Sequence, residues 1–143
     1  MPLIQRLKDF FENYDYSFVL LFGSYSSGEK KELSDIDIGV FFKKNIDYME
    51  IGYQSIILEE KFHKKIDITV LNDIYKKDPL FAFEILNNHK PILINDKNSF
   101  ISFKTLSQLY YLDYKDLIET NRKSLLYRIE NNKIGERNFV REN

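Results

Sequence analysis

Three aspartates in apolar surroundings are the residues whose type and spacing could do chemistry. Asp35 and Asp37 are two apart in the segment DIDIGVFF, and Asp67 lies within KIDITVL. Side chains two apart on a strand share one face, so Asp35 and Asp37 would place their carboxylates side by side. Such neighbours repel each other and are costly to bury without a partner. A divalent cation removes both difficulties, and hard oxygen ligands favour Mg²⁺ or Mn²⁺ over Zn²⁺.

A small polar loop precedes the aspartate pair. Gly23 and Ser24 directly follow the apolar run YSFVLLF, Gly28 adds a second flexible point, and Ser34 stands next to Asp35. Glycine lets the backbone approach a phosphate closely, while backbone N–H groups and a serine hydroxyl can bind its oxygens. Because Mg²⁺ in proteins usually also binds substrate phosphates, a nucleoside triphosphate is the natural co-ligand.

Asp67 becomes part of the same site if its strand neighbours the strand of Asp37. It could then complete a two-metal centre or accept a proton from an attacking hydroxyl. Each piece also has a plain alternative: a surface turn for GSYSSG, a surface or capping pair for Asp35 and Asp37, and a salt-bridged strand residue for Asp67. The order and spacing of all the pieces together favour the chemical interpretation.

Hydrophobic periodicity predicts the elements that must position these residues. We expect helices over residues 2–13, 47–62, 79–88 and 99–132, the last with a possible break near Asp113 or Thr120. We expect strands over residues 16–22, 35–42, 65–71 and 91–94. Ile46, Met49, Tyr53, Ile56 and Ile57 form the apolar stripe of the second helix. Pro91 favours an edge position for the fourth strand.

This order predicts an α/β (α+β) fold in which helices flank a small mixed sheet. We expect a core over residues 1–97 and a helical segment over 98–143 that packs on the core, on a partner, or on both. That segment is richer in large apolar residues than one small sheet can cover. It is therefore a candidate surface for homo- or hetero-oligomer formation.

At these residues the chain resembles the minimal nucleotidyltransferases of the polymerase-beta-like superfamily. Their pattern is Gly-Ser, a loop with a second Gly, Ser-Asp-x-Asp, and a lone Asp on a later strand. Its positions here are Gly23, Ser24, Gly28, Ser34, Asp35, Asp37 and Asp67. The resemblance implies a nucleotidyltransferase fold, ATP bound through the glycines and serines, and two Mg²⁺ ions held by the catalytic aspartates. Many members carry an arginine where this chain has Ser26-Ser27, and Lys30 or Lys31 is the candidate replacement.

Stand-alone members of this size resemble the antitoxin half of a toxin–antitoxin pair. The resemblance implies transfer of AMP from ATP to a tyrosine of a HEPN-type ribonuclease toxin, which is thereby silenced. Two alternatives stay open. One is a non-catalytic antitoxin that acts by occlusion, and the other is a nucleotidyltransferase acting on a small molecule or RNA.

Composition excludes several other classes. The 143 residues include 21 basic and 22 acidic side chains, no Cys and two His. A net charge of −1 disfavours direct nucleic-acid binding, and the missing Cys excludes disulfide and thiolate metal sites. Apolar runs are far shorter than a membrane span. We therefore expect a cytoplasmic protein without membrane attachment.

Overall fold

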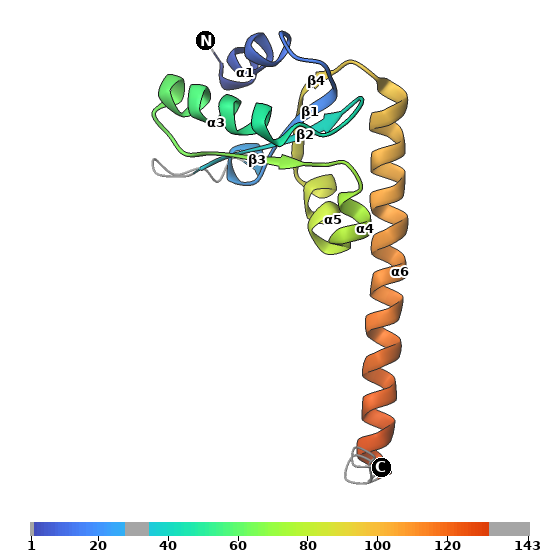
Figure 1. Cartoon of the computed structure of the whole chain (residues 1–143). Helices are drawn as coiled ribbons and strands as arrows, with labels where there is room; N and C mark the ends of the chain where they lie inside the picture. Colours follow the sequence, from blue (N-terminus) through green and yellow to red (C-terminus); the bar gives the residue numbers. More distant parts are fainter. Residues whose placement is uncertain (1, 28–34, 132–143) are drawn as a thin grey trace.

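The structure is a computed structural model, and it describes residues 2–27 and 35–131 (Figure 1). Along the described chain the helices are α1 (Leu3–Phe11), α2 (Ser24–Ser27), α3 (Tyr48–Phe62), α4 (Ile74–Lys77), α5 (Pro79–Asn87) and α6 (Lys97–Glu130). The strands are β1 (Tyr16–Phe22), β2 (Ile36–Phe42), β3 (Ile66–Val70) and β4 (His89–Ile94). None of the described helices combines the length and apolarity needed to cross a bilayer.

The four strands form one mixed sheet in the order β3-β2-β1-β4. β1 pairs antiparallel with both β2 and β4, whereas β2 and β3 run parallel. The connection from β2 to β3 contains the 15-residue α3, as a parallel crossover requires. The mixed sheet and the edge position of β4 confirm the predictions from sequence.

Side chains alternate between two cores on opposite faces of the sheet. Val19 and Leu21 of β1 pack with α1 and α3, while Phe18, Leu20 and Phe22 pack with α4, α5 and α6. On β2, the residues with even numbers face α1 and α3. The intervening residues of β2, including Asp37, therefore face the side of α5.

Short polar residues begin the helices that follow the strands. The Asp47 side chain accepts a hydrogen bond from Glu50 N at 3.1 Å, and Asp78 accepts one from Phe81 N at 3.1 Å. Pro79 occupies the first turn of α5, where its missing N–H costs nothing. These caps explain why α3 and α5 begin close to their predicted positions.

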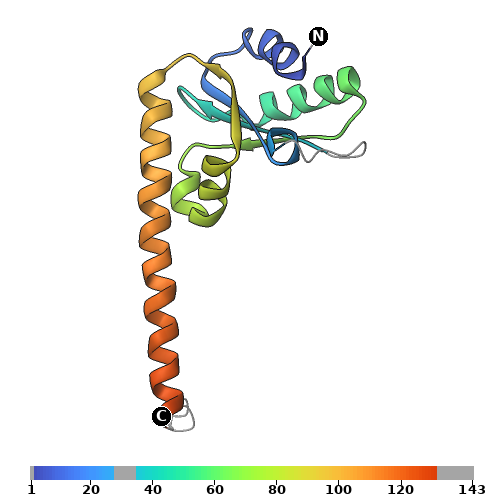
Figure 2. The same cartoon turned by 180° about the vertical axis from the view of Figure 1, so that it is seen from behind.

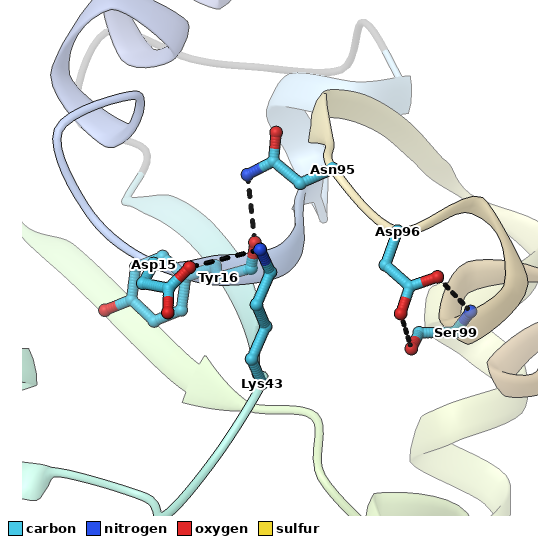
Figure 3. Close-up of polar contacts among 6 residues, drawn as sticks. All are labelled: Asp15, Tyr16, Lys43, Asn95, Asp96 and Ser99. Carbon is cyan, nitrogen blue, oxygen red and sulfur yellow. Dashed lines mark hydrogen bonds and ion pairs between the residues drawn. The ribbon is translucent and has the colours of Figure 1, made fainter.

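The junction between β4 and α6 is tied to the start of β1 (Figure 3). Asn95 Nδ2 donates to Tyr16 O at 2.9 Å, and Asn95 N and Asp96 N both donate to Ser17 O. Asp96 then caps α6, because its carboxylate accepts from Ser99 Oγ at 2.7 Å and from Ser99 N at 3.2 Å. The direction in which α6 leaves the sheet is thus set by backbone bonds to β1.

α6 is one continuous helix, so the break expected near Asp113 or Thr120 is wrong. Its first turns pack on the sheet, where Phe103 contacts Phe18 at a ring separation of 5.5 Å. The helix then continues well past α5 (Figures 1 and 2), and every residue from 120 to 130 is exposed. At about 1.5 Å per residue the helix is about 51 Å long.

Candidate active site

The turn after β1 is built on Gly23, which has a positive φ of 76°. Its carbonyl accepts hydrogen bonds from Ser26 N at 3.1 Å and from Asn88 Nδ2 at 3.4 Å. A Cβ at Gly23 would stand 3.3 Å from Cγ of Asp37 and overlap its Oδ2. Glycine is required here for both its backbone conformation and its close approach to the carboxylate.

Asp37 and Asp67 are register partners on the parallel strands β2 and β3. Each lies between isoleucines of the opposite core, so both carboxylates point to the face on which α5 packs. Phe22, the last residue of β1, is in turn the register partner of Asp37. The pairing of these three neighbouring strands therefore places Phe22, Asp37 and Asp67 side by side in one row across the sheet.

These residues line a cavity of about 480 Å³ between the sheet and α5. Strand and turn residues form one wall, and α5 with the residue that follows it forms the other. The lining residues are Phe22, Gly23, Asp37, Asp67, Ile68, Thr69, Phe81, Glu84, Ile85 and Asn88. A cavity of this size and mixed polarity is suited to a small-molecule ligand.

Negative charge dominates this cavity. Three of its lining residues are acidic (Asp37, Asp67 and Glu84). Within the part of the chain that the structure describes, no basic residue lines it. Burial, followed by the charges of Asp67 and Asp35, raises the pKa of Asp37. A polyphosphate cannot approach such a cavity unless a cation neutralises the carboxylates.

The donor set fits a magnesium ion. Among the described residues no three His, Cys, Asp or Glu side chains converge closely enough to hold a metal by themselves. Mg²⁺ characteristically binds one or two carboxylates and completes its shell with waters and substrate phosphates. Asp37 and Asp67, paired on neighbouring strands with the pKa of Asp37 raised, present such a set.

The other residues predicted for the site are placed less centrally. Asp35 lies one residue before β2, so the strand begins at Ile36 and not at residue 35 as predicted. Ser24 begins α2 directly after the turn and is not a lining residue of the cavity. Gly28 and Ser34 lie outside the described residues, as do Lys30 and Lys31.

The wall on α5 is the part of the cavity that the sequence did not reveal. Phe81, Glu84, Ile85 and Asn88 recur at helical spacing, which placed them on a helix without indicating what that face covers. Phe81 packs edge-on against Phe22 with ring centroids 5.8 Å apart, which fixes the wall against the end of β1. The sequence offered one indication of this wall. Because α5 follows β3 closely in the chain, it must pack back onto the sheet near that strand.

Comparison with known proteins agrees with this geometry. The model of the polymerase beta nucleotidyltransferase family matches residues 5–98. Two proteins of Methanocaldococcus jannaschii, each named a protein adenylyltransferase, are 40% identical to the chain. The first match covers 72 residues, 50% of this chain and 84% of that protein, and the second covers 76 residues, 51% and 75%.

Solved structures share the fold. A chain from a crystal structure of a toxin–antitoxin with AMP-PNP matches at a TM-score of 0.67 and 15% identity, over 90% of this chain and 99% of that one. A chain from a complex of tri-AMPylated Shewanella oneidensis HEPN toxin with an MNT antitoxin matches at 0.57 and 15% identity, over 88% and 98%. The mixed sheet, the paired aspartates behind a glycine turn and the family match lead to one conclusion: the chain belongs to the polymerase beta nucleotidyltransferase family.

Proposed function

We propose that this protein is a magnesium-dependent protein adenylyltransferase that acts as an antitoxin. It transfers AMP from ATP to a tyrosine hydroxyl of a HEPN-type ribonuclease toxin and thereby neutralises the toxin. The observation that carries this proposal is the acidic cavity in which Gly23, Asp37 and Asp67 meet. The names of the 40% identical relatives support adenylyl transfer, and the fold shared with toxin–antitoxin complexes supports the choice of partner.

Residues in and around the cavity have the following proposed roles in this reaction. Gly23 is proposed to bind the triphosphate because it leaves its backbone open beside the carboxylate of Asp37, and Ser24 is proposed to add a contact from the start of α2. Gly28 and Ser34 are proposed to extend this contact along the loop. Asp35, Asp37 and Asp67 are the proposed metal ligands. When bound, Mg²⁺ offsets the charge of the phosphates and of the carboxylates.

The chemical step is an in-line displacement at the α-phosphorus. The tyrosine oxygen forms the new P–O bond, the bond to the bridging oxygen of the β-phosphate breaks, and pyrophosphate leaves. The exposed Asp67 carboxylate at the rim of the cavity accepts the hydroxyl proton. Phe81 and Ile85 exclude water from the inner wall, while Asn88 holds the Gly23 turn in place.

The distal half of α6 is the proposed docking surface for the toxin. Large apolar side chains there are exposed, among them Leu117, Ile118 and Leu125. Where α6 leaves the core, a shallow hollow of about 210 Å³ lies between Leu80 of α5 and Tyr114 of α6. An exposed apolar surface of this extent that joins a hollow is typical of protein–protein contacts.

A labelling experiment tests the proposal. The purified protein is incubated with Mg²⁺ and α-³²P-ATP in a lysate of its host, and products are separated by denaturing gel and thin-layer chromatography. We expect a labelled protein band that depends on the added protein and appears with α-labelled but not with γ-labelled ATP, because AMP and not phosphate is transferred. Mass spectrometry then locates AMP on a tyrosine.

Matched variants identify the source of the label. Asp37→Asn removes a carboxylate of the cavity and should abolish the band. Asp113→Asn makes the same chemical change on an exposed turn of α6 and should leave the band unchanged. Label only in a small product or in RNA would contradict the proposed acceptor. A variant Asp37→Asn that still neutralised the toxin in cells would favour an antitoxin that acts by occlusion.

A further inference from the structure

Three residues of the apolar stripe of α3, Met49, Tyr53 and Ile56, face solvent and not the core. Met49 is 87% exposed, Tyr53 is 62% exposed and Ile56 is 64% exposed, with Tyr48 beside them at 65%. The residues that α3 buries are Leu58 and Gln54. Of the stripe predicted from the sequence, Ile46 packs against the core and Ile57 is half-buried. The other three residues and Tyr48 stay largely exposed, which is unusual for four large side chains on one helix.

A buried hydrogen bond sets this orientation of α3. Gln54 is fully buried and its Oε1 accepts from Tyr16 Oη at 2.7 Å. Glu59, five residues later, accepts from Ile66 N at 3.2 Å and so ties the C-terminal part of α3 to the start of β3. Turning the apolar stripe inward would break both contacts and leave buried polar groups without partners.

We propose that this stripe is the interface of a homodimer in which two copies of α3 pack antiparallel about a two-fold axis between Gly52 and Tyr53. In that arrangement residues whose numbers sum to 105 lie opposite one another. Met49 then meets Ile56 of the second copy, and Tyr53 meets Gly52. The stripe is thus complementary to itself, with two aliphatic chains in contact and an aromatic ring over the one position that has no side chain.

The open space at Gly52 can accommodate the Tyr53 ring of the second copy. A Cβ built at Gly52 meets no atom within 4 Å outside its own stretch of helix, so no other segment of the described chain fills the position. A glycine in an exposed helix interior is unfavourable by itself, and a ring that packs against its backbone would offset that cost. A large side chain from a partner can therefore pack over Gly52, and the second copy supplies Tyr53.

Charges at the ends of the stripe are also complementary under the same symmetry. Glu60 extends the stripe by one turn, to the end of the helix pair that faces the segment before the second copy's α3, and that segment carries the exposed Lys44. Lys61 does not oppose this pairing, because its ammonium turns toward α1 and lies 5.6 Å from the centroid of the Phe10 ring. Antiparallel helices also align their dipoles favourably.

The area is sufficient for a weak dimer. Large side chains carry about 150–250 Å² each, so the exposed parts of these four amount to about 500 Å² per chain. Burial on both copies removes about 1,000 Å², the lower limit for a specific interface. α3 and α6 lie on opposite sides of the molecule (Figure 2), so this contact leaves the arm of α6 clear for a different protein.

Sedimentation velocity on the full chain, over a range from about 1 to 300 µM, tests the proposal. We expect a monomer–dimer equilibrium whose Kd rises at least about tenfold in Ile56→Glu. Gly52→Leu discriminates better. It enlarges the apolar surface but occupies the space in which Tyr53 of the second copy packs, so it should weaken the dimer. Non-specific hydrophobic association would instead become stronger. Leu117→Glu, at a position 58% exposed on α6, is the matched control and should leave the Kd unchanged.

Charge reversal gives an independent readout. Lys44→Glu and Glu60→Lys should each raise the Kd, and the double variant should restore it, because each pair re-forms across the axis. Circular dichroism checks that every variant is folded. A wild-type protein that is monomeric throughout, a dimer that Leu117→Glu dissolves and Ile56→Glu does not, or tighter association of Gly52→Leu would each overturn the proposal.

Discussion

Substituting Gly23 by alanine tests the geometry of the site most directly. The φ of 76° at this residue lies in the left-handed region, which costs an alanine roughly 1–2 kcal/mol. The added Cβ would also overlap Oδ2 of Asp37, and moving that carboxylate off its preferred rotamer costs roughly 0.5–1.5 kcal/mol. Because alanine restricts the unfolded chain, about 0.4–1 kcal/mol is recovered.

The net loss in the free energy of unfolding is therefore about 2 kcal/mol, a drop in Tm of about 4–8 °C for a chain of this length. Activity should fall further than stability. Displacing a reacting group by about 1 Å can cost about 100-fold in rate, and the Cβ acts directly on the Asp37 carboxylate. We expect at least that loss in adenylyl transfer at a temperature where both proteins are folded.

Differential scanning calorimetry and the labelling assay measure the two effects separately. Gly52→Ala is the matched control, because its Cβ meets nothing within 4 Å in the middle of a helix. At concentrations where the protein is monomeric it should raise the free energy of unfolding by about 0.5–1 kcal/mol and leave transfer unchanged. A Gly23→Ala protein with wild-type Tm, or with transfer within about threefold of wild type, would refute this account of the turn.

Three further predictions follow from groups near the site and the core. Burial and the neighbouring aspartates raise the pKa of Asp37, so its proton is held more tightly in the folded state. The Tm advantage of Asp37→Asn over the wild type, without Mg²⁺, should be largest at pH 7 and narrow as pH falls toward about 4; a constant difference would contradict this. Tyr16→Phe should cost about 1–3 kcal/mol of stability because it leaves buried Gln54 without that hydrogen bond, and adding Gln54→Leu should recover most of the loss in urea unfolding. Hydrogen bonds from Ser99 lower the pKa of Asp96, so Asp96→Ala should lower the Tm at pH 7, and the difference from wild type should shrink only in strong acid. An equal difference in Tm at every pH would show that Asp96 stabilises the start of α6 without its negative charge.

Much of the site was predictable because it is local. Gly23 and Asp37 lie at the end of one strand and the start of the next, and an apolar run on each side identifies both strands. A charged residue inside such a run is costly to bury, so its presence signals a function without any knowledge of the fold. The same reasoning placed Asp67 on a third strand, and the register of β2 and β3 shows that it lies beside Asp37. The roles of these residues as metal and nucleotide ligands remain predictions.

Only the tertiary structure could decide which face of each helix is covered. The periodicity of α3 predicts an apolar stripe that includes Met49, Tyr53 and Ile56, and hydrophobicity alone would turn these three residues inward. The buried bond between Tyr16 and Gln54 joins residues 38 apart and turns the stripe outward instead. The wall of Phe81 and Asn88 opposite the aspartates likewise depends on how α5 packs back onto the sheet. Sequence patterns report the period and polarity of a segment, whereas the partner of each face is set by contacts between segments far apart in the chain.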